Sequence, residues 1–158
     1  MNKSHHYNVK IEWTGNTGSG TSSYTAYERQ IEVSSIGKPV IPTSSDPAFR
    51  GDKSRYNPEE LLVASLSSCH MLWYLHLCAE NGIVVVKYKD EATGIMTETA
   101  NGSGKFESVT LKPVVYVSEP QMIENAIALH KKANEMCYVA KSCNFPVYHE
   151  PDCNTDEK

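Results

Sequence analysis

The longest apolar run of the chain extends from Asn57 to Gly82. Asn57 is a typical helix N-cap, and the Pro58 that follows suits the first helical position. Gly82 can take the left-handed conformation that ends a helix. The residues between them leave no broad polar face, so we predict a helix of about two dozen residues with most of its surface buried. Serines and histidines interrupt the run too often for a membrane span.

The segments before this helix show the alternation of apolar and polar residues that is typical of strands. Tyr7–Trp13 and Tyr24–Ser34 flank Asn16–Ser23, which is rich in Gly, Ser and Thr, so we predict an antiparallel hairpin. Val40–Ile41 suggests a short further strand. The polar, irregular stretch Thr43–Tyr56 then leads into the helix, and loops of this length inside a compact domain are often functional.

Three more strands are predicted after the helix. They cover Ile83–Lys89, Ala92–Glu98 and Lys105–Val117, with a turn at Asn101–Gly102. Pro113 cannot donate to a strand ladder, so we expect it at a sheet edge or a bulge.

A second helix is predicted from Glu119 to about Asn134, with Ser118 as its cap, and a last strand at Phe145–His149. The tail from Pro151 is polar and expected to fray. This order, with no repeat or linker, predicts a single α+β domain over residues 1–158 in which antiparallel sheets pack on the long helix. One small sheet cannot cover that helix fully, so we predict an intertwined homodimer.

Composition excludes several classes of protein. A formal charge of -4 and a pI near 5.8 argue against a nucleic-acid partner. The N-terminal MNKSHHYNVK has no apolar segment, so we expect a cytoplasmic protein that does not bind membranes. Five cysteines, an odd number, argue against a structural disulfide framework and leave packing, metal binding or thiol chemistry.

Cys69 lies near the middle of the predicted helix, ten residues after Glu59. It could be a small core hydrophobe. However, Arg50 and Arg55 lie in the loop that enters this helix, and a nearby guanidinium lowers the pKa of a thiol. Glu59 could hold such an arginine in a bidentate pair. Cys69 is therefore a candidate nucleophile.

Cys137 is the natural partner of Cys69, because it follows the second helix at a junction where a new helical turn could point backbone N–H groups at its sulfur. The alternative is a packed or surface cysteine. Cys143 could compete as a partner, whereas Cys78 is interpreted as core and Cys153 as incidental.

A metal site is a weaker hypothesis. The soft ligands are Cys69, His70, His76, Cys137, Cys143 and His149. No CxxC, HExxH or other recognised ligand spacing occurs among them, and we interpret His76 as a core histidine. Nucleotide-binding and serine-hydrolase motifs are also missing from the sequence.

Two motifs resemble those of the OsmC/Ohr family of thiol-dependent peroxidases. NPEELLVASLSSCHM at Asn57–Met71 is similar to the first family motif, with its glutamate ten residues before the cysteine. ANEMCYVAKS at Ala133–Ser142 is similar to the motif around the second cysteine. His70, which follows the first cysteine, is closer to the OsmC-like branches than to Ohr proper.

The resemblance implies a domain-swapped homodimer with an active site at each subunit interface. It also implies reduction of organic, and possibly inorganic, hydroperoxides in a stress response, with a dithiol or lipoyl-type external reductant and no metal or cofactor. Carried over by motif, Cys69 is the peroxidatic cysteine and Cys137 the resolving cysteine, and the two form an internal disulfide.

Glu59 matches the family glutamate that pairs with the catalytic arginine. Arg50, in AFRGD, lies near the family position of that arginine, while Arg29 and Arg55 remain alternatives. Two other functions stay open. One is a non-catalytic homodimer that binds an apolar ligand or only maintains the fold, and the other is a general disulfide reductase.

Overall fold

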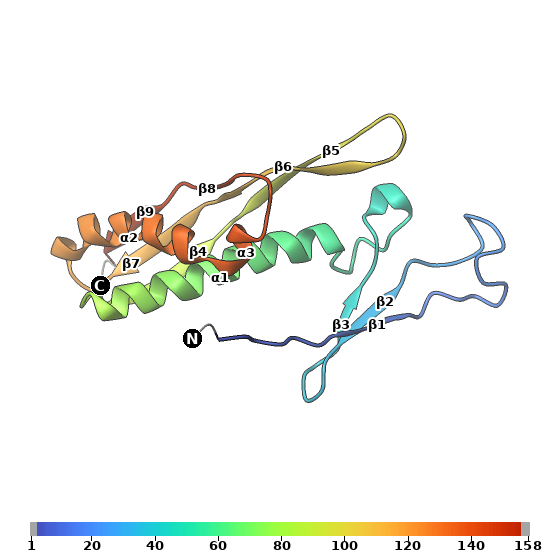
Figure 1. Cartoon of the computed structure of the whole chain (residues 1–158), viewed down its shortest axis with the longest axis horizontal. Helices are drawn as coiled ribbons and strands as arrows, with labels where there is room; N and C mark the ends of the chain where they lie inside the picture. The colour runs from blue at the N-terminus through green and yellow to red at the C-terminus, as the bar shows by residue number, and fades with distance from the viewer. Residues whose placement is uncertain (1–2, 156–158) are drawn as a thin grey trace. The chain divides into compact units, whose positions relative to one another are not determined.

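The computed structural model describes residues 3–155, which form a mixed α+β fold with three small sheets (Figure 1). The chain divides into two compact units, Met1–Leu61 and Leu62–Lys158. The long helix α1, Pro58–Glu80, begins in the first unit and continues through the second.

The N-terminal unit contains one antiparallel sheet of order β1-β2-β3. Its strands are β1 (Lys10–Trp13), β2 (Ile31–Ser34) and β3 (Ile41–Thr43). The predicted hairpin is confirmed, with Ile11 opposite Val33. Its strands are shorter than predicted, because residues 14–30 form a long connection rather than extended strand. A 3-10 turn at Pro47–Phe49, capped by Asp46, follows the sheet.

Both ends of α1 are held as the sequence predicts. The Asn57 side-chain oxygen accepts from the Glu60 N–H at 2.8 Å, and the Asn57 N–H donates to the Glu60 carboxylate at 3.0 Å. These two bonds form a capping box. At the other end Gly82 has φ +68°, and the Ile83 N–H donates to the Cys78 carbonyl at 2.9 Å, so the last turn is closed by a left-handed glycine.

The C-terminal unit contains two three-stranded sheets, of order β4-β7-β9 and β5-β6-β8. Their strands are β4 (Val85–Asp90), β5 (Thr93–Glu98), β6 (Gly104–Leu111), β7 (Pro113–Val117), β8 (Val147–His149) and β9 (Asp152–Thr155). The pairs β4–β7 and β5–β6 are antiparallel, whereas β6–β8 and β7–β9 are parallel, so the prediction of purely antiparallel sheets is wrong for this unit. The predicted strands are present in these sheets, but Lys105–Val117 is not the single strand expected. It is divided at Lys112 into β6 and β7, which belong to different sheets.

Two predictions about the ends of these strands are also wrong. Pro113 lies in the central strand β7, opposite Asp90, rather than at an edge or bulge. It is tolerated because it is the first residue of the strand. The tail does not fray over Asp152–Thr155, since these residues form β9 on the free side of β7. Cys153 is consequently a core residue, 6% exposed, while residues 156–158 lie outside the described part of the chain.

The second helix is α2, Ile123–Met136, and the short helix α3, Tyr138–Lys141, follows it. The predicted cap Ser118 is wrong, because a 3-10 turn at Pro120–Met122 precedes α2. The Ser118 hydroxyl lies 3.7 Å from the Met122 sulfur instead.

Only one face of α1 is fully buried in the single chain. Its buried residues are Leu66, His70, Tyr74 and Cys78, which recur every four positions. Leu72 on another face is 64% exposed. The prediction that most of the helix surface is buried is therefore wrong for one chain, because α2 and the sheets cover one side of the helix.

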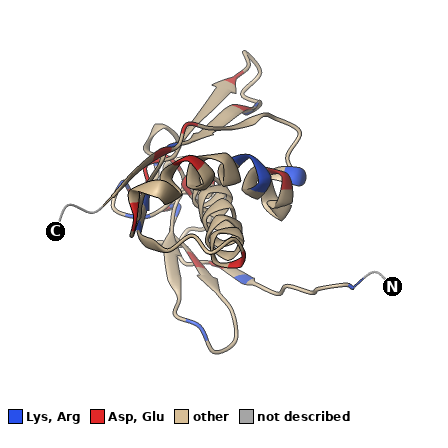
Figure 2. Cartoon of the chain, turned by 90° about the vertical axis from the view of Figure 1, so that its left-hand side faces the viewer, with Lys and Arg blue, Asp and Glu red and all other residues tan. Residues whose placement is uncertain are grey.

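No charged residue lies between Glu60 and Glu80, as the end-on view of α1 in Figure 2 shows. By length and composition alone, α1 is apolar enough to cross a membrane. Its buried face nevertheless packs into two hydrophobic clusters of the C-terminal unit, as expected for a core helix.

Candidate thiol site

Cys137 occupies the junction between the two C-terminal helices. It ends α2 and caps α3, and its sulfur accepts a hydrogen bond from the Ala140 N–H at 3.4 Å. The predicted helical turn that points an N–H at this sulfur is confirmed. The residue is 1% exposed, so the sulfur is almost fully removed from solvent.

The fold brings Cys69 of α1 beside Cys137, although the two are far apart in sequence. Burial raises the pKa of Cys137 to about 11, the neighbouring Cys69 thiol adds to this rise, and the Ala140 N–H opposes it. Both cysteines are free, and Cys69 is partly exposed. At neutral pH Cys137 is therefore a buried thiol, and Cys69 is the more accessible sulfur of the pair.

A cavity of about 330 Å³ lies in the N-terminal unit. Its apolar walls include Ile11, Trp13, Ile31 and Phe49. Arg29 and Glu59 also line it, so the structure brings two of the candidate residues to one cavity.

The Arg29 guanidinium is already engaged. It donates to the carbonyl oxygens of Tyr27 and Tyr24, each at 2.6 Å. Its central carbon also lies 4.1 Å from the Tyr27 ring and 4.4 Å from the Tyr24 ring. These contacts close the connection between β1 and β2, which gives Arg29 a structural role.

Arg50 differs from Arg29 in two ways. Its φ is +65°, and it is the only non-glycine residue between 3 and 155 with positive φ. Its guanidinium makes no hydrogen bond or ion pair with another described residue and lies 5.9 Å from the Tyr24 ring. Backbone strain of this kind costs free energy and is concentrated at functional sites.

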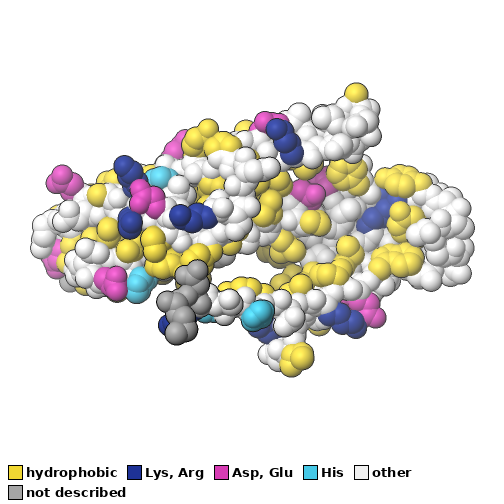
Figure 3. Space-filling view, viewed as in Figure 1, with side chains coloured by type: hydrophobic (Ala, Val, Ile, Leu, Met, Phe, Trp, Pro, Cys, Tyr) yellow, Lys and Arg dark blue, Asp and Glu magenta, His cyan; other side chains and the backbone are white. Residues whose placement is uncertain are grey.

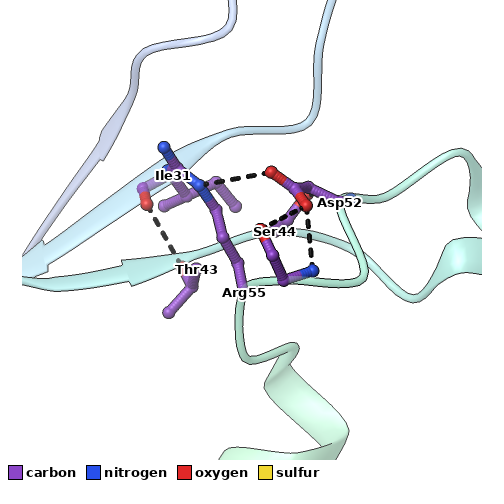
Figure 4. Close-up of polar contacts among 6 residues, drawn as sticks. Ile31, Thr43, Ser44, Asp52 and Arg55 are labelled. Carbon is purple, nitrogen blue, oxygen red and sulfur yellow. Dashed lines mark hydrogen bonds and ion pairs between the residues drawn. The ribbon is translucent and has the colours of Figure 1, made fainter.

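Arg55 fastens the loop that leads into α1. Its Nε lies 3.7 Å from an Asp52 carboxylate oxygen, and the Asp52 N–H donates to the Ser44 hydroxyl at 3.0 Å (Figure 4). Arg55 is thus committed to a local ion pair.

The predicted pair between Glu59 and an arginine is not formed among residues 3–155, where Glu59 makes no ion pair. Arg50 belongs to the N-terminal unit and Cys69 to the C-terminal unit. Their proximity therefore stays a prediction.

The remaining cysteines lie in less reactive surroundings. Burial raises the pKa of Cys78, Cys143 and Cys153 above the ordinary value for a thiol. A buried, protonated thiol is a poor nucleophile. In the described part of the chain, no group of three His, Cys, Asp or Glu side chains is arranged to hold a metal ion.

The buried histidines are not the one that the sequence predicted. His76 is exposed and lies 3.4 Å from the Glu80 carboxylate, so its interpretation as a core histidine is wrong. The fully buried histidines are His70 and His130, whose Nε2 and Nδ1 atoms are 2.9 Å apart. His130 shares a helix face with Ala126 and Ala133, and that spacing was the available signal.

Comparisons with known proteins agree with this fold. A family model for OsmC-like proteins matches residues 51–150. An OsmC-like protein of unknown function from Vibrio cholerae is 27% identical, with a TM-score of 0.81 over 94% of this chain and 99% of that one. No match was found among curated proteins.

Two solved structures of organic hydroperoxide resistance proteins share the fold. The Elizabethkingia anophelis protein is 18% identical, with a TM-score of 0.68 over 98% of this chain and 100% of that one. The Legionella pneumophila protein is 16% identical, also with a TM-score of 0.68, over 97% and 99% of the two chains.

Proposed function

Because the chain belongs to the OsmC-like protein family, we propose that it is a thiol-dependent peroxidase that reduces organic hydroperoxides. One observation carries the proposal, namely the contact between the partly exposed Cys69 and the buried Cys137. The two organic hydroperoxide resistance proteins of the same fold support the choice of substrate class.

The reaction proceeds in three steps. The Cys69 thiolate attacks the distal oxygen of the hydroperoxide, the O–O bond breaks, and the alcohol leaves after taking up a proton. The product is a sulfenic acid at Cys69. The Cys137 thiol then condenses with it, which forms a disulfide and releases water. An external dithiol of the lipoyl type restores both thiols by exchange and leaves as its own disulfide.

Arg50 is the proposed activator of the Cys69 thiolate, with Glu59 as its carboxylate partner. The strained backbone of Arg50 and its uncommitted guanidinium, which has no polar partner within residues 3–155, support this choice. Arg29 is the alternative, because it lines the same cavity as Glu59. Whichever arginine acts, its charge would stabilise the thiolate and polarise the peroxide.

A homodimer is part of the proposal. The incompletely buried apolar helix α1 supports it, because a second chain could cover the exposed faces of this helix. The active sites would lie where the two subunits meet.

Thiol titration tests the function. One equivalent of cumene hydroperoxide should remove two thiols per subunit from the wild type and form the Cys69–Cys137 disulfide. Cys137→Ser should lose one thiol and give a sulfenic acid that dimedone traps, and Cys69→Ser should lose none. Cys143→Ser is the matched control and should behave as the wild type. Unchanged thiols in the folded wild type would exclude the peroxidase.

The cavity in the N-terminal unit supports one other function, the binding of an apolar ligand without catalysis. Its volume of about 330 Å³ and apolar walls suit a small hydrophobic molecule. Saturable binding of an apolar fluorophore, together with thiols that resist cumene hydroperoxide, would favour this alternative.

A further inference from the structure

Two histidines form a hydrogen bond in the interior of the C-terminal unit. The Nε2 atom of His70 on α1 and the Nδ1 atom of His130 on α2 are 2.9 Å apart, and both residues are 0% exposed. Among residues 3–155 this is the only hydrogen bond between α1 and α2. It is therefore a directional polar contact at one point of the packing of α2 on α1.

The bond lies close to the two thiols along both helices. His70 directly follows Cys69. His130 precedes Cys137 by seven residues, about two helical turns, and Cys137 ends α2. Because a helix is stiff over this length, fixing the position of His130 against α1 also fixes the position of Cys137.

The surrounding side chains hold both rings in place. The His130 ring stacks on the Tyr74 ring, with centroids 3.8 Å apart and planes at 12°. His149 of β8 lies against His70, with centroids 5.8 Å apart. The outer nitrogens, Nδ1 of His70 and Nε2 of His130, are buried and have no partner in the described part of the chain. Each ring thus has a single polar contact, the one to the other histidine.

We propose that His70 and His130 are positioning residues, whose hydrogen bond sets the register of α2 on α1 and so aligns Cys137 with Cys69 for disulfide closure. The catalytic use of this alignment rests on the proposed peroxidase function. The alignment itself can be measured without a peroxide.

The experiment measures the equilibrium of the Cys69–Cys137 disulfide in the full chain against glutathione. Glutathione disulfide is reduced to two glutathione thiols as the two protein thiols are oxidised to one disulfide. His130→Leu and His70→Leu remove the bond. His130→Asn keeps a polar atom near the Nδ1 position, and His70→Gln keeps one near the Nε2 position.

Both leucine variants should lower the equilibrium constant for disulfide formation by about tenfold or more, because a buried polar partner is lost. The two amide variants should stay within about threefold of the wild type, since they retain a hydrogen-bonding group. His76→Leu, at an exposed histidine of the same helix, is the matched control and should leave the constant unchanged.

Three results would overturn the inference. The first is that the leucine variants fold and keep the wild-type equilibrium constant for disulfide formation, and the second is that the amide variants are as impaired as the leucine variants. The third is that the leucine variants fail to fold while the amide variants behave as the wild type. The last result would assign the bond to the fold as a whole. If the wild type ignores cumene hydroperoxide but the glutathione constants follow the expected pattern, the peroxidase proposal fails and the positioning role stands.

Discussion

At the scale of single residues, the three candidate arginines are separated by what each already contacts. Arg29 is bound by two carbonyls and two aromatic rings, and Arg55 is paired with Asp52. Arg50 has neither kind of polar partner within the described residues and sits in a left-handed conformation. Residue type alone could not rank them, because all three carry the same charge.

Substitution by lysine tests this ranking. Arg50→Lys should slow the reaction of Cys69 with cumene hydroperoxide by about tenfold or more, because lysine cannot reproduce the planar fork of the guanidinium. Stopped-flow measurement of thiol loss gives the rate. Arg29→Lys should lower the melting temperature more than the rate, since Arg29 closes a connection. The reverse pattern would transfer the activating role to Arg29.

At the scale of elements, α2 packs on α1 around a buried pair of histidines, His70 and His130. Burial lowers the pKa of His70 to about 4, with a contribution from His149, and it lowers the pKa of His130 to about 3, with contributions from both His70 and His149. Burial lowers the pKa of His149 as well. The pair is therefore neutral in the folded protein at physiological pH.

This burial makes the fold sensitive to acid. Between pH 6.5 and about 4 the unfolded chain binds protons at His70 and His130 that the folded chain does not. The stabilisation is thus complete above pH 6.5 and is lost as the pH falls. Urea unfolding should show a decrease of about 1.4 kcal/mol per pH unit for each proton taken up.

The matched variants for this prediction are His70→Gln and His76→Leu. The first removes one buried imidazole and should flatten the dependence of the unfolding free energy on pH. The second removes an exposed imidazole and is the control for the loss of a histidine from the same helix. A wild-type stability that does not vary from pH 6.5 to 4 would contradict the buried neutral pair.

At the scale of the whole molecule, many large apolar side chains are exposed on the surface of the single chain. Hydrophobic side chains are exposed on the face drawn in Figure 3, and the exposed large ones include Ile11, Trp13 and Leu72. Exposed apolar surface is typical of interaction sites. This is the physical reason to expect a second copy of the chain.

A charge on the exposed face of α1 tests the dimer. The wild type should show a mass of about twice 17.6 kDa in light scattering. Leu72→Glu should weaken association by at least about tenfold, because a carboxylate would be buried without a partner. Lys131→Glu, at an exposed position of α2, should keep the wild-type mass. A wild-type mass near 17.6 kDa would rule out the homodimer.

Much of the fold could be predicted because its signals are local. The capping residues Asn57 and Gly82 define α1 through contacts within a few residues, and the hairpin of β1 and β2 follows from alternation and a polar connection. The failures involve distant partners. β9 exists only because β7 offers a free side, and the cap at Ser118 is overridden by the turn that Pro120 begins.

The amino-acid sequence alone specifies the two motifs, the central helix and the choice of Cys69 and Cys137, because these depend on residue type and spacing. The folded chain was needed to show that these two cysteines are neighbours, that Cys153 is core, and that His70 bonds His130. Such contacts join segments far apart along the chain. They depend on how α2 and the C-terminal strands pack on α1, and no local pattern records that packing.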